Sequence, residues 1–543
     1  MNSSSVLHTP GPLDVCALNG QMHVRFRAER FTVLRAKLLY LCNKDEWYLR
    51  RDEAEMEIRF SDSEFEYFYA SVPRTDIRFA YIFELSCADG CVRYLSEEGL
   101  TDTFDHSLAY FNYFECCAQF PCDMMTVPDW VRTAVGYQIF PERFAIGSHD
   151  KDMSYVNAEW GEIPTPKSFY GGDLVGITEH LPYLVELGVN FIYLNPIFCS
   201  PTNHKYETVD YENVDPEFGG NEALRDLINE AHKNGIRIML DGVFNHLSWK
   251  HPFFLDAQKL GKASKYYDWF VWNPDGSYRT FSSVKAMPKL NTANPEVIEY
   301  FTDLCIDWMR DYGVDAWRLD VSDEISHRFL RAYRESLVRE KPDVIIIGED
   351  WHRQNWYLNG DEYDGVMNYG FTKACLDLFA FNTIDASAFR DRLVRLYHAF
   401  SMPASEKMLN LLDSHDTDRF LSRVKGDERK LRSAMAIMFF YPGIPSVYYG
   451  DEIGLSGGYD PDCRRCFDWE HDYTATPLWK AIKELIEFKK QPALSVGSFS
   501  INESDGVITI IRAAESQKLV LKVNPNNETR AGIPPYEYKI MEI

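Results

Sequence analysis

The sequence has few features of a membrane or nucleic-acid-binding protein. It has 57 Lys and Arg against 82 Asp and Glu, a formal net charge of -25, which anionic nucleic acids and membrane surfaces would repel. No uninterrupted apolar stretch is long enough to span a bilayer, and the first residues, MNSSSVLHTPGPLDV, lack the basic region and apolar core of a secretory signal. The sequence therefore predicts a soluble, cytoplasmic protein without nucleic-acid or membrane partners.

Cysteine patterns are equally uninformative. The 12 cysteines include no CxxC pair repeated at metal-finger spacing, and a disulfide framework is not expected in a chain of 543 residues. Cys116 with Cys117, and Cys463 with Cys466, are predicted to be reduced thiols. Neither an internal repeat nor a low-complexity segment is present. With 45% hydrophobic and 15% aromatic residues, the chain should be globular and multidomain.

The two ends of the chain show the short alternation of apolar and polar residues that is typical of β-strands. Near the start it occurs in MHVRFRAERF, EMEIRF and FEYFYASV, with polar turns between them. We predict an N-terminal β-sandwich over residues 1–125. The tail repeats the pattern in GVITIIRA, KLVLKVN and YEYKIMEI, which predicts a small C-terminal β domain over 493–543.

The middle of the chain alternates short apolar strands with helical segments, as βα units do. Eight candidate strands occur in order: GYQIF, NFIYL, IRIMLDGVF, VDAWRLD, VIIIGED, YDGVMNY, MLNLLDSHD and GIPSVYYGD. Amphipathic segments such as NEALRDLINEAHKNG lie between them. We therefore predict a (β/α)8 TIM barrel of the α/β class over 126–243 and 294–492. An aromatic-rich insertion at 244–293 follows the third strand as a loop-rich subdomain.

The fourth strand carries charges where a buried strand should have none. Arg318 and Asp320 stand two residues apart in DAWRLD, so they share one strand face, while Trp317 and Leu319 take the other. Taken alone, this would be a structural ion pair at a strand end. Whether this pair belongs to a functional site depends on the residues at the ends of the other strands.

Polar side chains recur at the ends of several predicted strands, where barrel enzymes place their chemistry. Taken singly, such an Asp caps a helix and such a His is a hydrogen-bonded structural residue, but three or more acids converging on one rim favour a shared site. The residues are Asp241, Asn245 and His246 after the third strand, Asp320 after the fourth, Glu349 and Asp350 after the fifth, and His415 and Asp416 after the seventh.

Two chemistries use a rim of carboxylates. Asp241, Asp320, Glu349 and Asp416 could gather a divalent metal, although paired histidines or a barrel lysine base are not evident. Glycoside hydrolysis instead needs one ionised and one protonated carboxyl. Arg318 would hold Asp320 in place and favour its anion, whereas Glu349, following the apolar VIIIG, should have a pKa raised by partial desolvation.

The same residues lie in blocks that resemble the α-amylase family of glycoside hydrolases, and within it the neopullulanase, cyclomaltodextrinase and maltogenic amylase group. The segment MPKLN is similar to the cyclomaltodextrinase-like members in particular. The four specific blocks are DGVFNH (241–246), DAWRLDVSDE (315–324), IIIGEDWH (345–352) and LLDSHDTDRF (411–420). The resemblance covers the whole barrel; the flanking β domains agree in order and size.

The resemblance implies a role for each matching position. Asp320 would be the nucleophile that forms a covalent glycosyl intermediate, and Glu349 the general acid that later activates water. Asp416 would hold the sugar hydroxyls. Such a retaining mechanism expects the two reacting carboxyls about 5 to 5.5 Å apart. The implied substrate-binding residues are Arg318, His246, His415, Tyr206, His204, Asp460 and Arg464; Asp241 is expected to hold the rim together.

Three segments depart from the family pattern. Many relatives bind calcium through a loop reading ERFANGD together with an FGGD turn, and this chain has ERFAIGSHDKD. Ile146 cannot ligate calcium, so the site is expected to be lost and no cofactor to be required; Asp150, Asp152 and Asp173 offer a weaker alternative. DVSDE replaces DVANE beside the leaving group. GEDWH places Asp350 next to Glu349, where strand alternation should turn it away.

These observations predict a retaining α-glucan hydrolase that cuts α-1,4 bonds in cyclodextrins, maltooligosaccharides, pullulan or starch, with α-1,6 hydrolysis and transglycosylation as further activities. The alternatives are an oligosaccharide α-glucosidase or transglycosylase of the same family, and a catalytically inactive glucan-binding protein. The N-terminal domain resembles the group's starch-binding-type module, which implies a homodimer formed through it.

Overall fold

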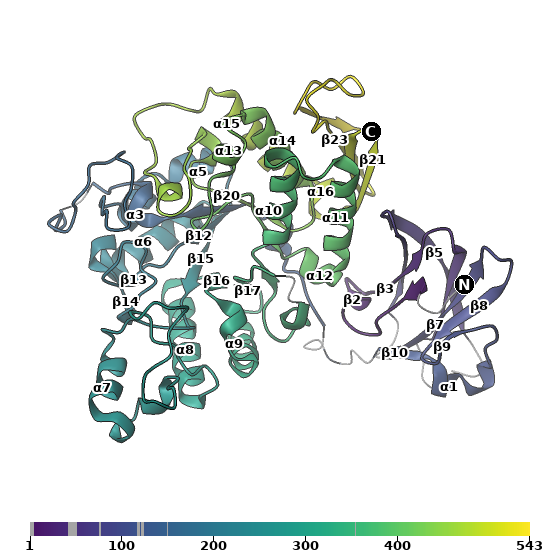
Figure 1. Ribbon diagram of the computed structural model, residues 1–543, viewed down its shortest axis with the longest axis horizontal. Helices are drawn as coiled ribbons and strands as arrows, with labels where there is room; N and C mark the ends of the chain where they lie inside the picture. The colour runs from purple at the N-terminus through teal and green to yellow at the C-terminus, as the bar shows by residue number, and fades with distance from the viewer. Residues whose placement is uncertain are drawn as a thin grey trace.

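The computed structural model describes residues 5–41, 51–74, 78–116, 120, 124–148, 150–352 and 355–543. Figure 1 shows an N-terminal β domain beside a central barrel, with a smaller C-terminal sheet packed against the barrel helices. The expected fold class is confirmed. The predicted thiol Cys117 and His149 of the ERFAIGSHDKD loop lie outside the described residues.

The N-terminal domain is built from antiparallel strands in two layers. Strand β5 pairs with both β6 and β4 and thereby connects the layers. Alternate residues point into a shared core, where the rings of Phe26 and Phe68 stack 4.7 Å apart. The described strands are β1 (Val6–Leu7), β2 (Val15–Leu18), β3 (Gln21–Glu29), β4 (Val33–Leu41), β5 (Asp52–Ser61), β6 (Phe65–Pro73), β7 (Phe79–Cys87), β8 (Val92–Ser96), β9 (Gly99–Thr101) and β10 (Phe114–Cys116).

The central strands are parallel and follow one another around a barrel. A parallel bridge between Met367 and Leu409 closes it, because these residues adjoin the two terminal strands of the sheet. The eight strands are those expected from the sequence. They are β11 (Gly136–Ile139), β12 (Phe191–Leu194), β15 (Arg237–Gly242), β16 (Ala316–Leu319), β17 (Ile345–Gly348), β18 (Gly365–Val366), β19 (Leu409–Asn410) and β20 (Ile444–Tyr448).

Helices cover the outside of the barrel. Several begin at residues typical of helix N-termini: Asn294 caps α8 by accepting from the Glu296 amide, with Pro295 at the first helical position. The main barrel helices are α3 (Pro141–Phe144), α4 (Leu174–Glu179), α5 (Leu181–Leu187), α6 (Gly220–Lys233), α8 (Pro295–Asp307), α9 (His327–Glu340), α10 (Tyr369–Cys375), α11 (Ala386–His398), α12 (Met402–Ser405), α13 (Phe420–Arg423), α14 (Glu428–Phe440) and α15 (Pro477–Lys489).

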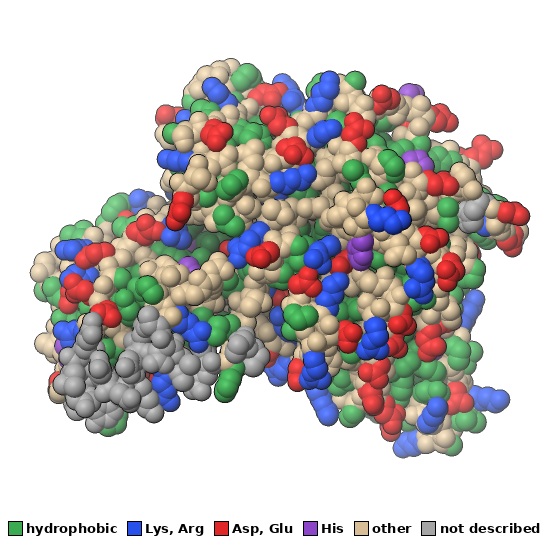
Figure 2. Space-filling model, turned by 180° about the vertical axis from the view of Figure 1, so that it is seen from behind, with side chains coloured by type: hydrophobic (Ala, Val, Ile, Leu, Met, Phe, Trp, Pro, Cys, Tyr) green, Lys and Arg blue, Asp and Glu red, His purple; other side chains and the backbone are tan. Residues whose placement is uncertain are grey.

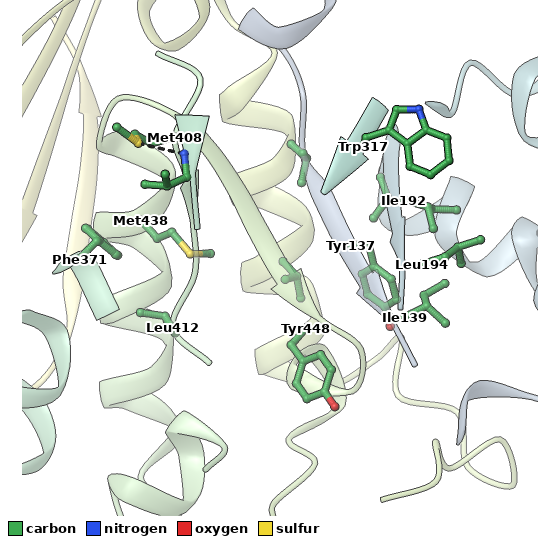
Figure 3. Packing of buried hydrophobic residues seen from close by; sticks show 14 of the residues in the cluster. Tyr137, Ile139, Ile192, Leu194, Trp317, Phe371, Met408, Leu412, Met438 and Tyr448 are labelled. Atoms are coloured by element: carbon green, nitrogen blue, oxygen red, sulfur yellow. Dashed lines mark hydrogen bonds between the residues drawn. The ribbon is translucent and has the colours of Figure 1, made fainter. Parts of the chain in front are cut away.

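Strand alternation separates two cores. Phe191 and Tyr193 of β12 point into the barrel interior, whereas Ile192 and Leu194 lie in the layer between strands and helices. Figure 3 shows this outer layer, with Ile192 and Leu194 beside Tyr137 and Ile139 of the neighbouring strand. The same rule places Trp317 and Leu319 outside, so Ala316, Arg318 and Asp320 face inward.

The insertion after β15 forms a separate helical and loop-rich layer. Its helix α7 (Pro252–Leu260) packs through Phe254 against the ring of Phe270. Isolated bridges, such as that between His246 and Lys289, tie the insertion back to the barrel rim. The insertion therefore stands beside the carboxyl ends of the strands.

The C-terminal sheet is antiparallel and consists of β21 (Ser498–Ser504), β22 (Val507–Ala514), β23 (Gln517–Val523) and β24 (Tyr538–Glu542). Strand β21 was not among the expected segments, because SFSINES has only two strongly apolar residues. The domain limits drawn from the sequence stay predictions. The limit at 492 falls inside α16 (Pro492–Ser495).

Arginines connect the N-terminal domain to the barrel. Arg25 donates to the carbonyls of His398 and Phe400 at 3.1 and 2.8 Å, and Arg395 of α11 pairs with the buried Asp62 at 2.8 Å. Figure 2 shows acidic and basic side chains interspersed over the visible face, with no broad basic surface there. Across the described residues, every helix is too short or too polar to cross a bilayer.

Candidate active site

A cavity of about 860 Å³ opens at the carboxyl ends of the barrel strands. Eight of the ten residues predicted for the site line it: Asp320, Glu349, Asp416, His204, Tyr206, His246, Asp460 and Arg464. The other two, Arg318 and His415, are fully buried behind them. Segments more than 200 residues apart in the chain thus meet in one place, as the joint reading of the strand ends predicted.

Arg318 lies at the centre of the carboxylates. Its Nη1 donates to Asp241 at 2.7 Å and to Asp320 at 2.9 Å, and its Nη2 lies 2.8 Å from Oε2 of Glu349. One buried guanidinium is therefore shared among three carboxyls. One cation compensates only one of three negative charges, so burial and the neighbouring carboxyls oppose the ionisation of Asp241 and of Asp320.

Arg318 acts on Asp320 in the expected direction, toward a lower pKa, but burial outweighs it. Burial raises the pKa of Asp320 well above its ordinary value, and Glu349 and Asp241 act in the same direction, although Arg318 opposes them. The sequence showed Arg318 next to one acid. It did not show that the same cation is divided among three.

Glu349 accepts hydrogen bonds from two neighbours besides its ion pair with Arg318. The backbone N–H of Val321 donates to Oε2 at 3.0 Å, and the indole of Trp351 donates to Oε1 at 3.1 Å. Its surroundings are thus more polar than the apolar strand before it suggested. Val321 adopts a left-handed conformation with φ 46°, which is strained for a β-branched residue and directs this N–H toward the acid.

Tyr206, His415 and Asp241 form a hydrogen-bonded wall of the cavity. The Tyr206 hydroxyl lies 2.6 Å from Nε2 of His415 and donates to Asp241 at 3.1 Å. The amide of Gln138 donates to Nδ1 of His415 at 2.8 Å, so Nε2 carries the proton. The rings of Tyr206 and His415 are parallel with centroids 5.6 Å apart, which holds Tyr206 as a flat surface on the cavity.

The remaining acid, Asp416, is bound to Arg464. Their contact is 3.3 Å, and Arg464 also pairs with Asp460 at 2.9 Å and donates to the carbonyl of His415 at 2.7 Å. Burial raises the pKa of Asp416, against the effect of Arg464. The predicted Asp460–Arg464 pair is present, and it holds the segment after β20 against the end of β19.

The two remaining histidines are neutral donors or acceptors. Burial lowers the pKa of His246 and of His204 to about 3 each. Nε2 of His246 is buried without a hydrogen-bond partner among the described residues, and its ring faces the cavity. A buried ring nitrogen without a partner beside a cavity is suited to a hydrogen bond with a substrate hydroxyl.

Sequence reasoning missed Trp351 and Tyr193. Trp351 lines the cavity and stacks on Tyr369 with centroids 3.8 Å apart; its place directly after GED was the available signal. Tyr193 donates to Asp241 at 2.7 Å from the inner face of β12, which period-2 alternation could have indicated. Asp241 accepts from Arg318, Tyr193 and Tyr206, and its expected role in holding the rim together stays a prediction.

Asp350 turns away from the cavity, as alternation predicted. It does not line the cavity; its Oδ1 accepts from the His352 amide at 2.9 Å. Burial raises the pKa of Asp350 to about 6. The side chain of Asp350 therefore lies on the opposite face of the strand from that of Glu349.

Comparison with known proteins agrees with this geometry. Residues 138–491 match the family described as "Alpha amylase, catalytic domain", and residues 1–118 match "Alpha amylase, N-terminal ig-like domain". The chain belongs to the α-amylase family of glycoside hydrolases, which confirms the resemblance found in the sequence.

Full-length relatives are similar over almost the whole chain. A cyclomaltodextrinase of Geobacillus thermopakistaniensis (strain MAS1) is 39% identical over 94% of this chain and 89% of its own. An intracellular maltogenic amylase of Bacillus subtilis (strain 168) is 38% identical over 97% and 92%. A solved structure of a cyclomaltodextrinase superposes with a TM-score of 0.91 at 37% identity, covering 97% of this chain and 92% of that one.

Proposed function

We propose that the chain is a retaining α-glucan hydrolase that cleaves α-1,4 bonds of cyclodextrins, maltooligosaccharides, pullulan or starch, with α-1,6 hydrolysis and transglycosylation as side activities. The observation that carries the proposal is the meeting of Asp320, Glu349 and Asp416 around one cavity. The names of the relatives, cyclomaltodextrinase and maltogenic amylase, support the substrate class.

In this proposal Asp320 attacks the anomeric carbon while Glu349 protonates the leaving oxygen. A covalent glycosyl ester forms on Asp320, and Glu349 then removes a proton from water as it attacks the ester, which restores both residues. Arg318 supports the ionised form of Asp320 once a sugar has displaced solvent. The expected spacing of 5 to 5.5 Å between the two carboxyls stays a prediction.

The lining of the cavity suits an uncharged sugar. Tyr206 and Trp351 offer flat aromatic surfaces to the apolar face of a pyranose, and Asp416 with His246 offers hydrogen bonds to its hydroxyls. Arg464 is already paired with Asp416 and Asp460, so it does not present a free cation. A phosphorylated or acidic sugar would meet mostly carboxylates here.

Two alternatives remain open. An oligosaccharide α-glucosidase or a transglycosylase of the same family would use the same three acids and differ in its products. An inactive glucan-binding protein would retain the barrel without turnover, but the presence of all three carboxyls argues against it.

The location and assembly of the chain are part of the proposal. We place it in the cytoplasm, which the name of the intracellular B. subtilis relative supports. We also propose a homodimer formed through the N-terminal domain, in which the partner narrows access to the cavity.

Product analysis tests the function. The wild-type chain and Asp320→Asn are incubated with maltoheptaose, β-cyclodextrin, pullulan and soluble starch, and the products are separated and their anomeric configuration is followed by NMR. We expect α-configured products from the wild type and a loss of at least about 10³-fold in the variant. Lack of cleavage of any glucan by the wild type would favour the binding protein; glucose as the first product from chain ends would favour the α-glucosidase.

A further inference from the structure

The loop that follows β11 differs from that of calcium-binding relatives, and an ammonium group lies at its centre. Nζ of Lys151 donates to the carbonyl of Gly171 at 2.6 Å, to the carboxylate of Asp173 at 2.5 Å and to the carbonyl of Glu217 at 3.2 Å. The Lys151 side chain is 7% exposed and that of Asp173 is fully buried. Three oxygens from separate segments therefore surround one buried positive charge.

The surrounding residues do not fit a calcium ion. Calcium takes six to eight oxygen ligands, but Ile146 presents an exposed hydrocarbon side chain, and the Ser148 hydroxyl donates to Glu179. Asp152 is exposed and accepts from the Ser154 amide. Of the acids that could have rebuilt a site, only Asp173 reaches the centre, and Lys151 already occupies that position.

We propose that the ammonium group of Lys151 replaces a bound metal ion as the cation that holds this region together. A lysine ammonium donates three hydrogen bonds, which matches the three acceptors. Because the ammonium group is part of the polypeptide, no separate ion has to bind, and chelators cannot remove it. The chain then needs no calcium at this place.

Lys151 joins segments that lead into two barrel helices. Gly171, with φ 90°, forms the turn before α4, where Asp173 caps the helix through the Gly176 amide at 2.7 Å. Glu217 lies in the turn before α6. Even a Cβ at Gly171 would lie 2.8 Å from the methyl carbon of Met153, so any side chain there would displace Met153.

A second buried lysine extends the connection toward the substrate. Lys205 pairs with Asp215 at 2.8 Å and with the carboxylate of Glu217 at 2.5 Å. It directly precedes Tyr206 in the chain. Glu217 is thus bound by both ammonium groups: its carbonyl by Lys151 and its carboxylate by Lys205. Lys151 therefore acts as a positioning residue for the wall that carries Tyr206.

Thermal unfolding of the full-length protein in EDTA, and then with millimolar CaCl2, tests the proposal. We expect the apparent Tm of the wild type to differ by less than about 1 °C between the two conditions, and calorimetric titration to detect no bound calcium. A calcium-dependent rise of several degrees with one ion bound per chain would overturn the proposal, whatever the behaviour of any variant.

Lys151→Ala then leaves the three oxygens without their cation. We expect its Tm in EDTA to fall by about 5 °C and to recover partly with CaCl2, NaCl or KCl. The matched control is Lys167→Ala, which removes the same charge from an exposed position of the same region. If Lys151→Ala melts with the control, or is destabilised but indifferent to all three salts, Lys151 is an ordinary ion-pair partner and the proposal fails.

Discussion

The ionisation of Asp320 ties the proposed catalysis to the stability of the fold. Because its pKa is raised in the folded chain, the folded state binds more protons than the unfolded state between the ordinary Asp pKa of about 3.9 and the raised value. The free energy of unfolding therefore falls as the pH rises through this window. Asp320 is retained at a cost to stability, as residues at functional sites often are.

This cost predicts that Asp320→Asn stabilises the protein at neutral pH. Arg318 keeps its contacts with Asp241 and Glu349, so the neutral amide removes a destabilising charge without orphaning the guanidinium. We expect a rise in the apparent Tm of about 2 °C or more at pH 7, which shrinks as the pH falls and vanishes below the ordinary Asp pKa of about 3.9, where the carboxyl is protonated in both states. Asp303→Asn, exposed on α8, is the control; a variant less stable than the wild type at pH 7 would contradict the prediction.

The catalytic roles of Glu349 and Asp320 can be distinguished by how their variants respond to the leaving group of the substrate. Fluoride needs no protonation to depart, so Glu349→Gln should lose about 10³-fold or more on β-cyclodextrin but still release fluoride from α-maltosyl fluoride in its first turnover. Added azide should then attack the glycosyl ester and give maltosyl azide of retained configuration, seen by NMR. Asp320→Asn should release no fluoride. Equal loss on both substrates would remove the acid role from Glu349.

At the scale of elements, a buried arginine connects the C-terminal sheet to the barrel, in addition to the apolar core that they share. Arg512 of β22 donates to the carbonyls of Phe440, Leu494 and Gly497 at 3.2, 2.9 and 3.1 Å, and burial lowers its pKa to about 10. These carbonyls lie at or just beyond the ends of α14 and α16, where backbone acceptors lack helical partners. The sheet is thus part of the same folding unit as the barrel helices.

Arg512→Met should therefore destabilise the whole chain. Methionine fills similar volume but leaves three buried carbonyls unsatisfied, at a cost of about 3 kcal/mol in the free energy of unfolding. Denaturant unfolding followed by circular dichroism measures it, with Lys518→Met on the exposed side of β23 as the control. Hydrolytic activity at 25 °C should stay within about twofold of the wild type, because Arg512 does not line the cavity. Separate transitions for sheet and barrel would contradict a single unit.

At the scale of the whole molecule, net charge should govern assembly. Two chains of net charge -25 repel each other, and salt screens this repulsion over a Debye length of about 8 Å at physiological ionic strength. We expect sedimentation velocity to detect a species of twice the 63.1 kDa chain mass, with a dimer fraction that increases from 20 mM to 300 mM NaCl. A monomer at every salt and protein concentration would refute the proposed homodimer.

Local periodicity was enough to predict much of this protein. Alternation with period two placed Arg318 and Asp320 on one strand face and turned Asp350 away from Glu349, because side-chain direction along a strand depends only on neighbouring residues. Apolar residues at helical spacing located α6 in the same way. Strand β21 was missed, since SFSINES has too few apolar residues to show the alternation.

Only the tertiary structure decided how charged groups from distant segments interact. The sequence indicated that acids would meet at one rim, but not that Asp320 is buried deeply enough there for burial, with the neighbouring carboxyls, to outweigh Arg318 and raise its pKa. Nor did it show that Lys151 reaches oxygens 20 and 66 residues away. The sequence by itself determined which way each side chain points from its strand; pKa values and cation sites depend on distances between segments, and these exist only after the chain has folded.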